Sequence, residues 1–276
     1  MPKLILAVLD GLGYDAATAA AGYLEHLTSI GQAAKYRLLG EMPPVSRPMY
    51  ETLLTGLPVS RHGILTNDFT RSSRCENLFS LASAQKLTTA AAAYYWVAEL
   101  YNGGPFDWAT GRYQLDSQGL IRHGIYYFAD NYPDSHLMLD GEYLRRSRTP
   151  DFLLVHSMNC DDAGHRFGSN SREYAVAAVT AFNCLDRLLP LWRQNGYDVV
   201  ITADHGMDEL GIHSGNRLSH RQVPLYILSQ SVPQGDFTDQ PLSNLCVAPL
   251  CCRLLGLTPT PEMMEVNVLT GEKTHE

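Results

Sequence analysis

The feature that most restricts the fold is an apolar run that ends abruptly in two polar side chains and a glycine. Residues 199–207 read Val-Val-Ile-Thr-Ala-Asp-His-Gly-Met. Such a run indicates a buried strand, and in α/β proteins ligand-binding side chains gather where strands end. Asp204 and His205 stand at that position, and Gly206 permits a sharp turn of the backbone. A carboxylate that only caps the next helix would explain Asp204 but not His205.

Two further apolar runs end in a similar way. Residues 4–9 lead into Asp10 and a glycine, and residues 152–155 are followed by Asp161 and His165. The four-residue spacing of Asp161 and His165 brings both to one side of a helical turn, although such pairs also occur as structural hydrogen-bonded couples. Asp10 has the same two readings, as a helix cap or as a metal ligand.

A glycine-flanked loop adds a further imidazole, His213. Together these segments offer three carboxylates and three imidazoles: Asp10, Asp161, His165, Asp204, His205 and His213. Two zinc ions, each with about four N or O ligands, would use such a set and keep positions free for a nucleophile and a substrate. The pattern therefore predicts a metallohydrolase, with manganese as an alternative metal.

Strand-like runs alternate with helix-like segments along the whole chain. The predicted strands are 4–9, 88–95, 151–155, 198–203 and 223–228. The predicted helices are 15–32, 46–55, 77–86, 172–195 and 245–255, with Pro190 expected to kink or end the fourth near its last turn. This order predicts a three-layer α/β/α sandwich around a mostly parallel sheet. With 276 residues, 45% of them hydrophobic, a single domain over 1–276 is expected.

Residues 101–135 differ from the rest because they are rich in Gly, Tyr, Phe, Trp and Asp. We expect a hairpin around Ser117-Gln118-Gly119 and a small cap or excursion over the site, rather than a separate domain.

Charge and cysteine content limit the classes of partner and the cellular location that we expect for this chain. The net charge is −8 and no polybasic run is present, so nucleic acid and anionic membranes are poor candidate partners. A small phosphorylated substrate stays open because bound cations supply positive charge locally. The run 4–9 is too short for a signal peptide or a membrane span. The six cysteines lack paired spacings, which favours reduced thiols and a cytoplasmic location.

A nucleophile is offered by Ser46, which begins the predicted helix 46–55. One reading makes Ser46 a helix cap, with Pro48 in the first turn. The other makes it a nucleophile, because a helix N-terminus favours negative charge and a bound metal lowers the pKa of a hydroxyl.

In their order along the chain these segments resemble the alkaline phosphatase superfamily, and most closely its nucleotide pyrophosphatase/phosphodiesterase branch. The matching segments are Asp10-Gly11, Ser46 through Gly56, His62-Gly63-Ile64 with Asn67, Asp161 with His165, Asp204-His205-Gly206-Met207, and Gly211-Ile212-His213-Ser214-Gly215. The resemblance spans nearly the whole chain.

The resemblance implies three protein ligands for each of two zinc ions: Asp161, His165 and His213 for one, and Asp10, Asp204 and His205 for the other. It implies that Ser46 is the nucleophile, at the open position of the second ion. Asn67 and the backbone amide at Ser46-Arg47 are implied to hold a phosphoryl oxygen. His220 is an alternative to His213 as the last ligand.

Some positions depart from the family pattern. Ser46 replaces the usual threonine, and Arg47 stands where an aromatic often packs on a nucleobase. Arg47 could bind phosphate or stack on a base. The usual Trp-Pro-Gly-Ser segment is reduced to Trp96 and unrelated residues, so Trp96 is a weaker candidate for substrate contact. His156 and His62 are expected to be structural or to support ligands.

The resemblance implies a phosphoric ester hydrolase that transfers the phosphoryl group to Ser46 and then to water. A phosphodiesterase or nucleotide pyrophosphatase is favoured. A phosphomonoesterase or phosphonate hydrolase is the alternative, with Arg47, Arg112 or Arg122 supplying the positive charge that a monoester needs. A catalytically silent metal-binding relative is the alternative from another class, against which the complete ligand set argues.

Overall fold

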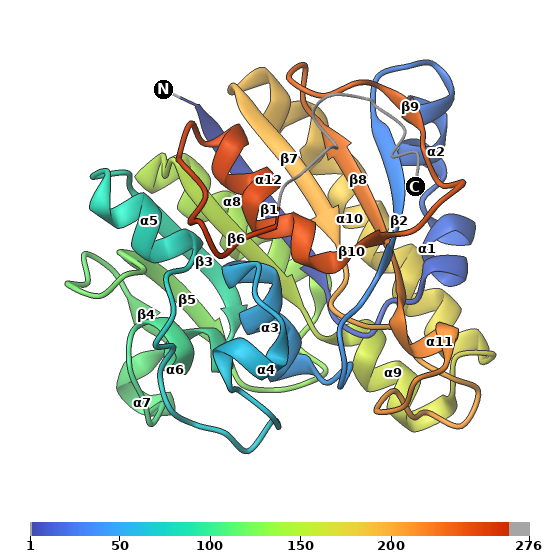
Figure 1. Cartoon of the computed structure of the whole chain (residues 1–276), viewed down its shortest axis with the longest axis horizontal. Coiled ribbons are helices and arrows are strands. Elements are labelled where there is room, and N and C mark those ends of the chain that lie inside the picture. The colour runs from blue at the N-terminus through green and yellow to red at the C-terminus, as the bar shows by residue number, and fades with distance from the viewer. Residues whose placement is uncertain (1, 265–276) are drawn as a thin grey trace.

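The computed structural model describes residues 2–264, which form one large sheet covered by helices (Figure 1). The strands are β1 (Lys3–Leu9), β2 (Ala34–Leu39), β3 (Thr89–Tyr94), β4 (Tyr113–Gln114), β5 (His123–Tyr127), β6 (Phe152–Ser157), β7 (Tyr197–Thr202), β8 (Gln222–Leu228), β9 (Gly235–Asp236) and β10 (Leu242–Ser243). They lie in the order β10-β2-β8-β7-β1-β6-β3-β5-β4, with β9 paired to β2.

The centre of the sheet is parallel and its edges are mixed. Strands β7, β1, β6, β3 and β5 run in one direction. Strand β8 is antiparallel to both of its neighbours, β7 and β2. Strands β1 and β6 are buried along almost their whole length, as expected when helices cover both faces of a parallel sheet. The predicted mostly parallel sheet is confirmed.

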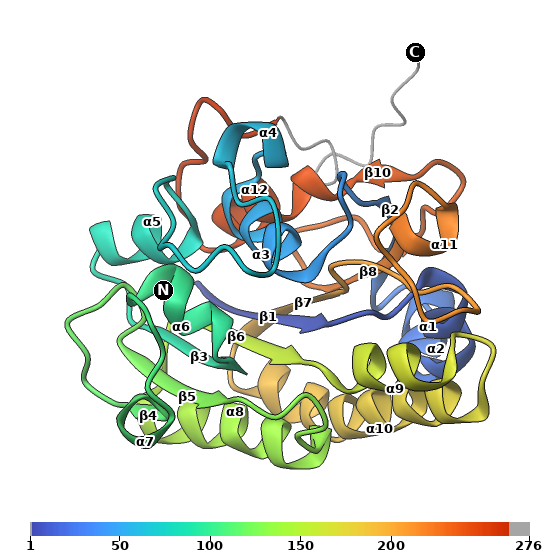
Figure 2. The ribbon, with the colours of Figure 1, turned by 90° about the horizontal axis from the view of Figure 1, so that it is seen from below.

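Helices form a layer on each face of the sheet (Figure 2). They are α1 (Tyr14–Ala20), α2 (Gly22–Ser29), α3 (Ser46–Thr55), α4 (Val59–His62), α5 (Leu78–Ala84), α6 (Trp96–Tyr101), α7 (Trp108–Gly111), α8 (Asp134–Arg148), α9 (Asn159–Phe167), α10 (Arg172–Gln194), α11 (Leu218–Arg221) and α12 (Val247–Leu254), with a 3-10 turn η1 (Asn244–Cys246). Helices α8 and α10 pack on one face, whereas α3, α5 and α12 lie over the other. The predicted three-layer α/β/α arrangement is confirmed.

The predicted helices are present, with local changes. The segment 15–32 forms two helices, α1 and α2, that meet at Ala21. The next residue, Gly22, has a low helix propensity, which is consistent with a break at this point. Pro190 lies inside α10, which ends one turn later at Gln194. The longer elements that were not predicted are β2, β5, α8 and α9, and several short helices and strands were also missed. Strand β2 carries Lys35, which is buried through an ion pair with Glu25 at 2.8 Å, so its pattern is not simply apolar.

The stretch 101–135, expected to be a cap, instead adds strands to the main sheet. Strand β5 pairs with β3 in parallel, and β4 pairs with β5 through the loop that holds the predicted hairpin turn. All residues of β5 are buried, which explains why this aromatic segment joins the sheet. A role for the rest of the stretch in covering the site stays a prediction.

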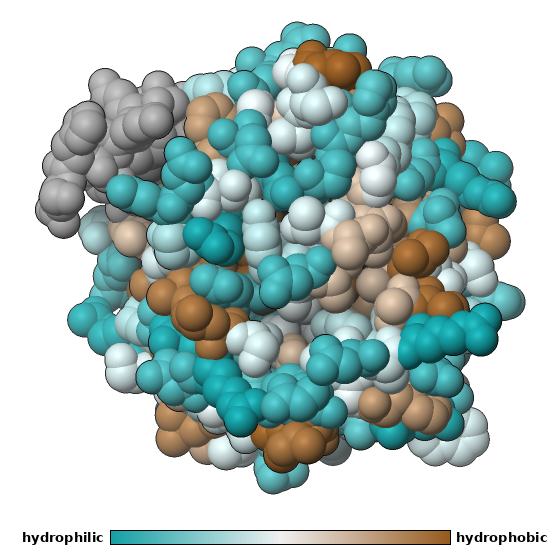
Figure 3. Space-filling view, turned by 90° about the vertical axis from the view of Figure 1, so that its right-hand side faces the viewer, coloured by the Kyte–Doolittle hydropathy of each residue, from teal (hydrophilic) through white to brown (hydrophobic). Residues whose placement is uncertain are grey.

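The surface is mixed in polarity. On the face shown in Figure 3, hydrophobic residues form separate patches among hydrophilic ones. Within residues 2–264, no helix combines the length and the apolar character that crossing a membrane requires. All six cysteines are unpaired, and four of them are buried, in agreement with the predicted reduced thiols.

The loop after β1 approaches α9 so closely that a side chain cannot fit between them. Gly11 has a φ of +70°, and a Cβ atom on it would lie 2.7 Å from the Cα atom of Asp161. Gly31 has a similar φ of +68°, but a Cβ atom there would meet nothing within 4 Å.

We therefore expect Gly31→Ala to lower the free energy of unfolding by about 1–2 kcal/mol, the cost of a left-handed conformation for alanine. Gly11→Ala should lower it by about 1–3 kcal/mol more, because the loop and α9 must also separate. Urea denaturation of both variants measures the difference. A loss for Gly11→Ala no larger than that for Gly31→Ala would contradict the close approach.

Candidate metal centre and nucleophile

Three carboxylates meet at the carboxyl ends of three adjacent central strands. Asp10 follows β1, Asp204 follows β7, and Asp161 lies on α9, which follows β6. In Figure 1, α9 and α11 lie beyond this end of the sheet. The three side chains are 0%, 0% and 5% exposed. The topology therefore places the predicted carboxylates together in the interior.

Backbone hydrogen bonds fix the loop that carries the first carboxylate. The amide of Asp10 donates to the carbonyl of Ser157, and the amide of Gly11 donates to Asp204 Oδ1 at 3.1 Å. Tyr174 of α10 donates its hydroxyl to the carbonyl of Gly11 at 2.6 Å. These bonds tie the ends of β1, β6 and β7 to one another.

Each of the three predicted histidine ligands has its tautomer set by a backbone carbonyl. Nδ1 lies 2.9 Å from the Gly211 oxygen in His165, 3.0 Å from the Gly206 oxygen in His205, and 2.8 Å from the Pro44 oxygen in His213. A carbonyl only accepts, so each Nδ1 carries the proton and each Nε2 presents a lone pair. This is the usual arrangement of metal-binding histidines.

The Nε2 atoms converge on the carboxylates at distances that suit ligands of one ion. His165 Nε2 lies 3.1 Å from His213 Nε2 and 3.4 Å from Asp161 Oδ2. His205 Nε2 lies 3.3 Å from Asp10 Oδ1. Two ligands of a tetrahedral zinc ion, each bound at 2.0–2.1 Å, are about 3.3 Å apart. The spacing of the cluster therefore fits.

Unsatisfied atoms also indicate a cation. Asp10 Oδ1, Asp161 Oδ1 and Asp204 Oδ2 are buried without a hydrogen-bond partner. The lone pairs of His165 and His213 would repel at 3.1 Å unless a positive charge lay between them. Burying such groups unpaired is costly. The donor set thus fits divalent cations.

The converging atoms form two overlapping groups: Asp10, Asp204 and His205, and Asp161, His205 and His213. His205 belongs to both, and its ring stacks on that of His213 with centroids 3.8 Å apart. His165 adjoins the second group. All six predicted ligands are therefore brought together.

Ser46 is the first residue of α3, and Val45 takes the N-cap position. The N-cap side chain, that of Val45, makes no capping hydrogen bond, and Pro48 occupies the first turn of α3 as expected. Ser46 Oγ lies 3.2 Å from His205 Nε2, and the side chain is 2% exposed. The hydroxyl therefore faces the carboxylate–histidine cluster rather than its own helix.

Asn67 lies beside the first turn of α3, which carries Ser46. Its Oδ1 accepts a hydrogen bond from the backbone amide of Arg47 at 2.9 Å. The side-chain amide is thereby oriented, and its NH₂ group is left to donate.

The charge of Arg47 is compensated inside the protein. Its guanidinium donates to Glu99 Oε2 at 2.7 Å and to the Phe69 carbonyl at 3.2 Å. The Trp96 ring lies over the guanidinium at 4.8 Å. The side chains of Arg47 and Glu99 are 1% and 6% exposed. The two residues predicted to contact substrate, Arg47 and Trp96, thus contact each other, and Arg47 directly follows Ser46 in the chain.

His220, the alternative ligand, has other partners. Its Nδ1 accepts from the amide of Gly215 at 3.0 Å, and its Nε2 lies 3.1 Å from Asp208 Oδ2. Asp208 also accepts from the amide of Ile212, next to His213. This geometry favours His213 as the ligand and gives His220 a part in holding the loop.

Two side chains that were not among the predicted site residues contact Asp10. Tyr50 donates its hydroxyl to Asp10 Oδ2, and His156 Nε2 lies 3.2 Å from the same oxygen. The signal for Tyr50 was its four-residue spacing from Ser46 on one helix face. The expectation that His156 supports a ligand agrees with this contact.

The model of the type I phosphodiesterase / nucleotide pyrophosphatase family matches residues 4–223, which include the whole cluster. The chain belongs to this family. Venom phosphodiesterase 2 of Crotalus adamanteus is 28% identical over 91% of this chain and 33% of its own length. Ectonucleotide pyrophosphatase/phosphodiesterase family member 3 of Bos taurus is 24% identical over 76% of this chain and 25% of its own. The chain thus spans about a third or less of these relatives.

Solved structures share the fold. Murine ectonucleotide pyrophosphatase/phosphodiesterase 5 has a TM-score of 0.72 at 12% identity, covering 94% of this chain and 96% of that one. An inactive variant of it, in complex with AMP, has a TM-score of 0.71 at 12% identity over 95% and 96%. Phosphonate monoester hydrolase of Agrobacterium radiobacter has a TM-score of 0.67 at 15% identity over 99% and 78%.

Burial opposes charge on the cluster when no cation is bound. Burial and the neighbouring Asp204 raise the pKa of Asp10 to about 8. Burial also raises the pKa values of Asp161 and Asp204 well above 3.8. It lowers the pKa of His213 to about 3. A bound cation favours ionised carboxylates and neutral imidazoles.

Without a cation, folded Asp10 holds its proton up to about pH 8, whereas the unfolded chain loses it near 3.8. The folded state then binds more protons, so the free energy of unfolding should fall as the pH rises from about 7 to about 8. We expect the free energy of unfolding to fall by at most about 1.4 kcal/mol per pH unit for each carboxylate that is protonated in the folded state. The buried His205 and His213 do not oppose this fall, because burial lowers their pKa values in the folded state and an unfolded histidine is already largely neutral above about pH 7.

Urea denaturation in the presence of a chelator measures this slope. Saturating Zn²⁺ should abolish or reverse it, because the cation keeps the carboxylates ionised. Equal slopes with chelator and with Zn²⁺ would contradict the assignment of these carboxylates to a cation site.

Proposed function

We propose that this chain is a metal-dependent phosphodiesterase or nucleotide pyrophosphatase that uses Ser46 as its nucleophile. The observation that carries the proposal is the contact of Ser46 Oγ with His205 Nε2, 3.2 Å apart at the edge of the carboxylate–histidine cluster. Membership of the type I phosphodiesterase / nucleotide pyrophosphatase family supports it.

In the proposed reaction, Ser46 Oγ forms a bond to phosphorus and the bond to the leaving oxygen breaks. The serine proton is lost in this step, and the leaving oxygen takes up a proton from solvent. The intermediate is a phosphodiester of Ser46 that keeps the second ester group, and water then cleaves its bond to Oγ, which releases the monoester and restores the hydroxyl. The N-terminus of α3 favours the negative charge that develops there, and the oriented NH₂ group of Asn67 donates to a phosphoryl oxygen. The three histidines and three carboxylates have no acid or base role of their own in this scheme, since they serve as ligands.

We assign Asp10, Asp204 and His205 to one zinc ion and Asp161, His165 and His213 to the other, with manganese as the alternative metal. When bound, such ions lower the pKa of a hydroxyl or water and stabilise the charge on the attacking and leaving oxygens. Imidazole-rich sets favour zinc, whereas hard oxygen sets favour manganese or magnesium.

Charge at the site favours a diester over a monoester. A monoester carries one more negative charge at neutral pH, and a free cation beside Ser46 would be needed to bind it. The Arg47 guanidinium is instead paired with Glu99 at 2.7 Å. The Arg112 guanidinium, an alternative source of positive charge, stacks on Tyr113 and Tyr132 at 5.3 Å from each ring centroid.

A nucleotide is the substrate class that we favour. The half-buried Trp96 ring, which lies against the Arg47 guanidinium, offers an aromatic surface for a base. The murine relative that was solved with AMP supports this choice. A cytoplasmic location, which the unpaired cysteines favour, stays a prediction.

Ser46→Ala tests the nucleophile. Turnover of bis-p-nitrophenyl phosphate should fall by at least about a thousandfold, since the covalent step is lost. The metal content of the purified variant should match that of the wild type, because the six other ligands remain. Metal analysis and initial rates measure both effects, and unchanged turnover would rule out Ser46 as the nucleophile.

Substrate preference is tested with the diester, p-nitrophenyl phosphate and p-nitrophenyl methylphosphonate. We expect the wild type to prefer the diester. Glu99→Gln keeps a hydrogen-bond acceptor for Arg47 but removes the compensating charge, so the ratio of monoester to diester kcat/KM should rise by roughly tenfold.

A wild-type preference for the monoester would move the assignment to a phosphatase, and one for the phosphonate to a phosphonate hydrolase. Bound metal without turnover of any of the three would indicate a silent relative. An unchanged ratio in Glu99→Gln would contradict the charge argument.

A further inference from the structure

Asp10 uses its two carboxylate oxygens differently. Oδ2 accepts the hydroxyl of Tyr50 and lies 3.2 Å from His156 Nε2. Oδ1 has no hydrogen-bond partner and lies 3.3 Å from His205 Nε2. The side chain is fully buried. One oxygen is thus held by the protein, while the other is left for the ligand group of Asp10, Asp204 and His205.

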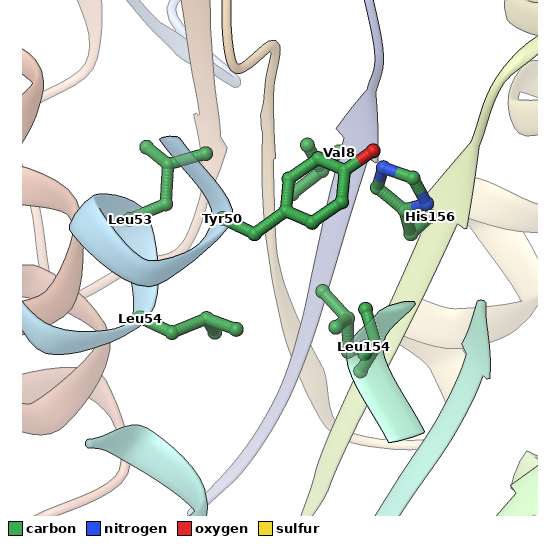
Figure 4. Close-up of a pocket in the computed structure, with 7 residues that line it drawn as sticks. Val8, Tyr50, Leu53, Leu54, Leu154 and His156 are labelled. Atoms are coloured by element: carbon green, nitrogen blue, oxygen red, sulfur yellow. The ribbon is translucent and has the colours of Figure 1, made fainter. Parts of the chain in front are cut away.

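The two groups that hold Oδ2 come from different layers of the fold. Tyr50 lies on α3, one turn after Ser46, and His156 lies near the end of β6. Their rings meet edge to face with centroids 4.5 Å apart. Figure 4 shows the Tyr50 hydroxyl directed toward the His156 ring, beside Val8 of β1. The helix of the nucleophile and the central sheet therefore meet at Asp10.

The surroundings of these bonds on the side away from the cluster are mainly apolar. Tyr50 and His156 line a small cavity whose other lining residues are apolar: Val8, Leu53, Leu54, Val97 and Leu154 (Figure 4). Tyr50 is 2% exposed and His156 is 1% exposed. The Tyr50 hydroxyl also lies 3.3 Å from the Met158 sulfur, but a thioether is a weak acceptor and would not replace a carboxylate oxygen. The bond to Asp10 is therefore favoured, and it holds the carboxylate in one orientation.

We propose that Tyr50 and His156 are positioning residues that aim Asp10 Oδ1 at a divalent cation held with Asp204 and His205. Removing either group frees the carboxylate to rotate and weakens the binding of that cation. Mutation of the hydrogen-bond partners of metal ligands typically lowers metal affinity by 10–100-fold. The second cation, held by Asp161, His165 and His213, keeps its affinity. This inference rests on the proposed metal-dependent function.

Tyr50→Phe is the principal test, because it removes only one oxygen atom. The purified full chain is stripped of metal and titrated with Zn²⁺ against a chromophoric chelator, which resolves two binding steps. We expect one step to weaken by about 10–100-fold and the other to stay within about threefold of the wild type. The matched control is Tyr101→Phe, which also removes one buried hydroxyl. This hydroxyl donates to Glu51, which lies on α3 like Tyr50, and it does not contact Asp10. This variant should leave both steps unchanged.

His156 provides an independent pair of variants. Gln keeps a donor at a position similar to Nε2, whereas Leu fills the space without one. His156→Gln should retain the affinity of the sensitive step better than His156→Leu, a difference that loss of packing alone would not produce. Melting temperatures of the metal-free variants establish that each one folds.

The outcomes separate this inference from the proposed function. Wild-type protein that binds no divalent cation overturns both. Wild-type protein that binds two cations, with Tyr50→Phe and His156→Leu binding them equally well, overturns the positioning role alone. Equal weakening of both steps in Tyr50→Phe also overturns it, because it would indicate a general loss of structure.

Discussion

The site depends on holding three carboxylates in one buried volume. Asp10, Asp161 and Asp204 are nearly inaccessible to solvent, and the ion-pair partners described for them are histidines. Such a group of like charges raises the free energy of the folded chain unless protons or cations neutralise it. The large apolar core of the central sheet has to supply the stability that this arrangement removes. A bound cation changes the same groups from a cost into a source of stability, because metal binding is then part of the folding free energy.

The protein aligns the cluster mainly through its backbone. The ends of β1, β6 and β7 are tied together by amide donors, and the histidine rings are oriented by carbonyl oxygens. Side chains then complete the alignment at particular atoms, as Tyr50 and His156 do for one oxygen of Asp10. Because main-chain groups are present whatever the side chain, the framework tolerates extensive sequence change. This agrees with a TM-score of 0.72 at only 12% identity to the murine family member.

Much of the fold and the grouping of the site residues could be predicted from the sequence, because strand ends carry recognisable Asp and His residues. The central strands and the helix of Ser46 are uninterrupted local patterns that do not depend on distant partners. Strand β5 could not be predicted, because its place beside β3 is set by long-range pairing rather than by its composition. The ion pair of Arg47 with Glu99 could not be predicted from the sequence either, since the two residues are brought together by the packing of α6 beside α3. Sequence spacing therefore indicates which groups come together, but not which charges are already compensated.

The hydrogen bond between His213 Nδ1 and the Pro44 carbonyl joins two segments that are 169 positions apart. Pro44 lies in the loop that leads into Ser46, whereas His213 lies in the loop after β7. Ser46, the proposed nucleophile, and the imidazole of His213 are therefore not positioned independently. A longer loop before Ser46, introduced to admit a bulkier substrate, would also rotate this imidazole. Any redesign of the entrance has to vary both loops as a single unit.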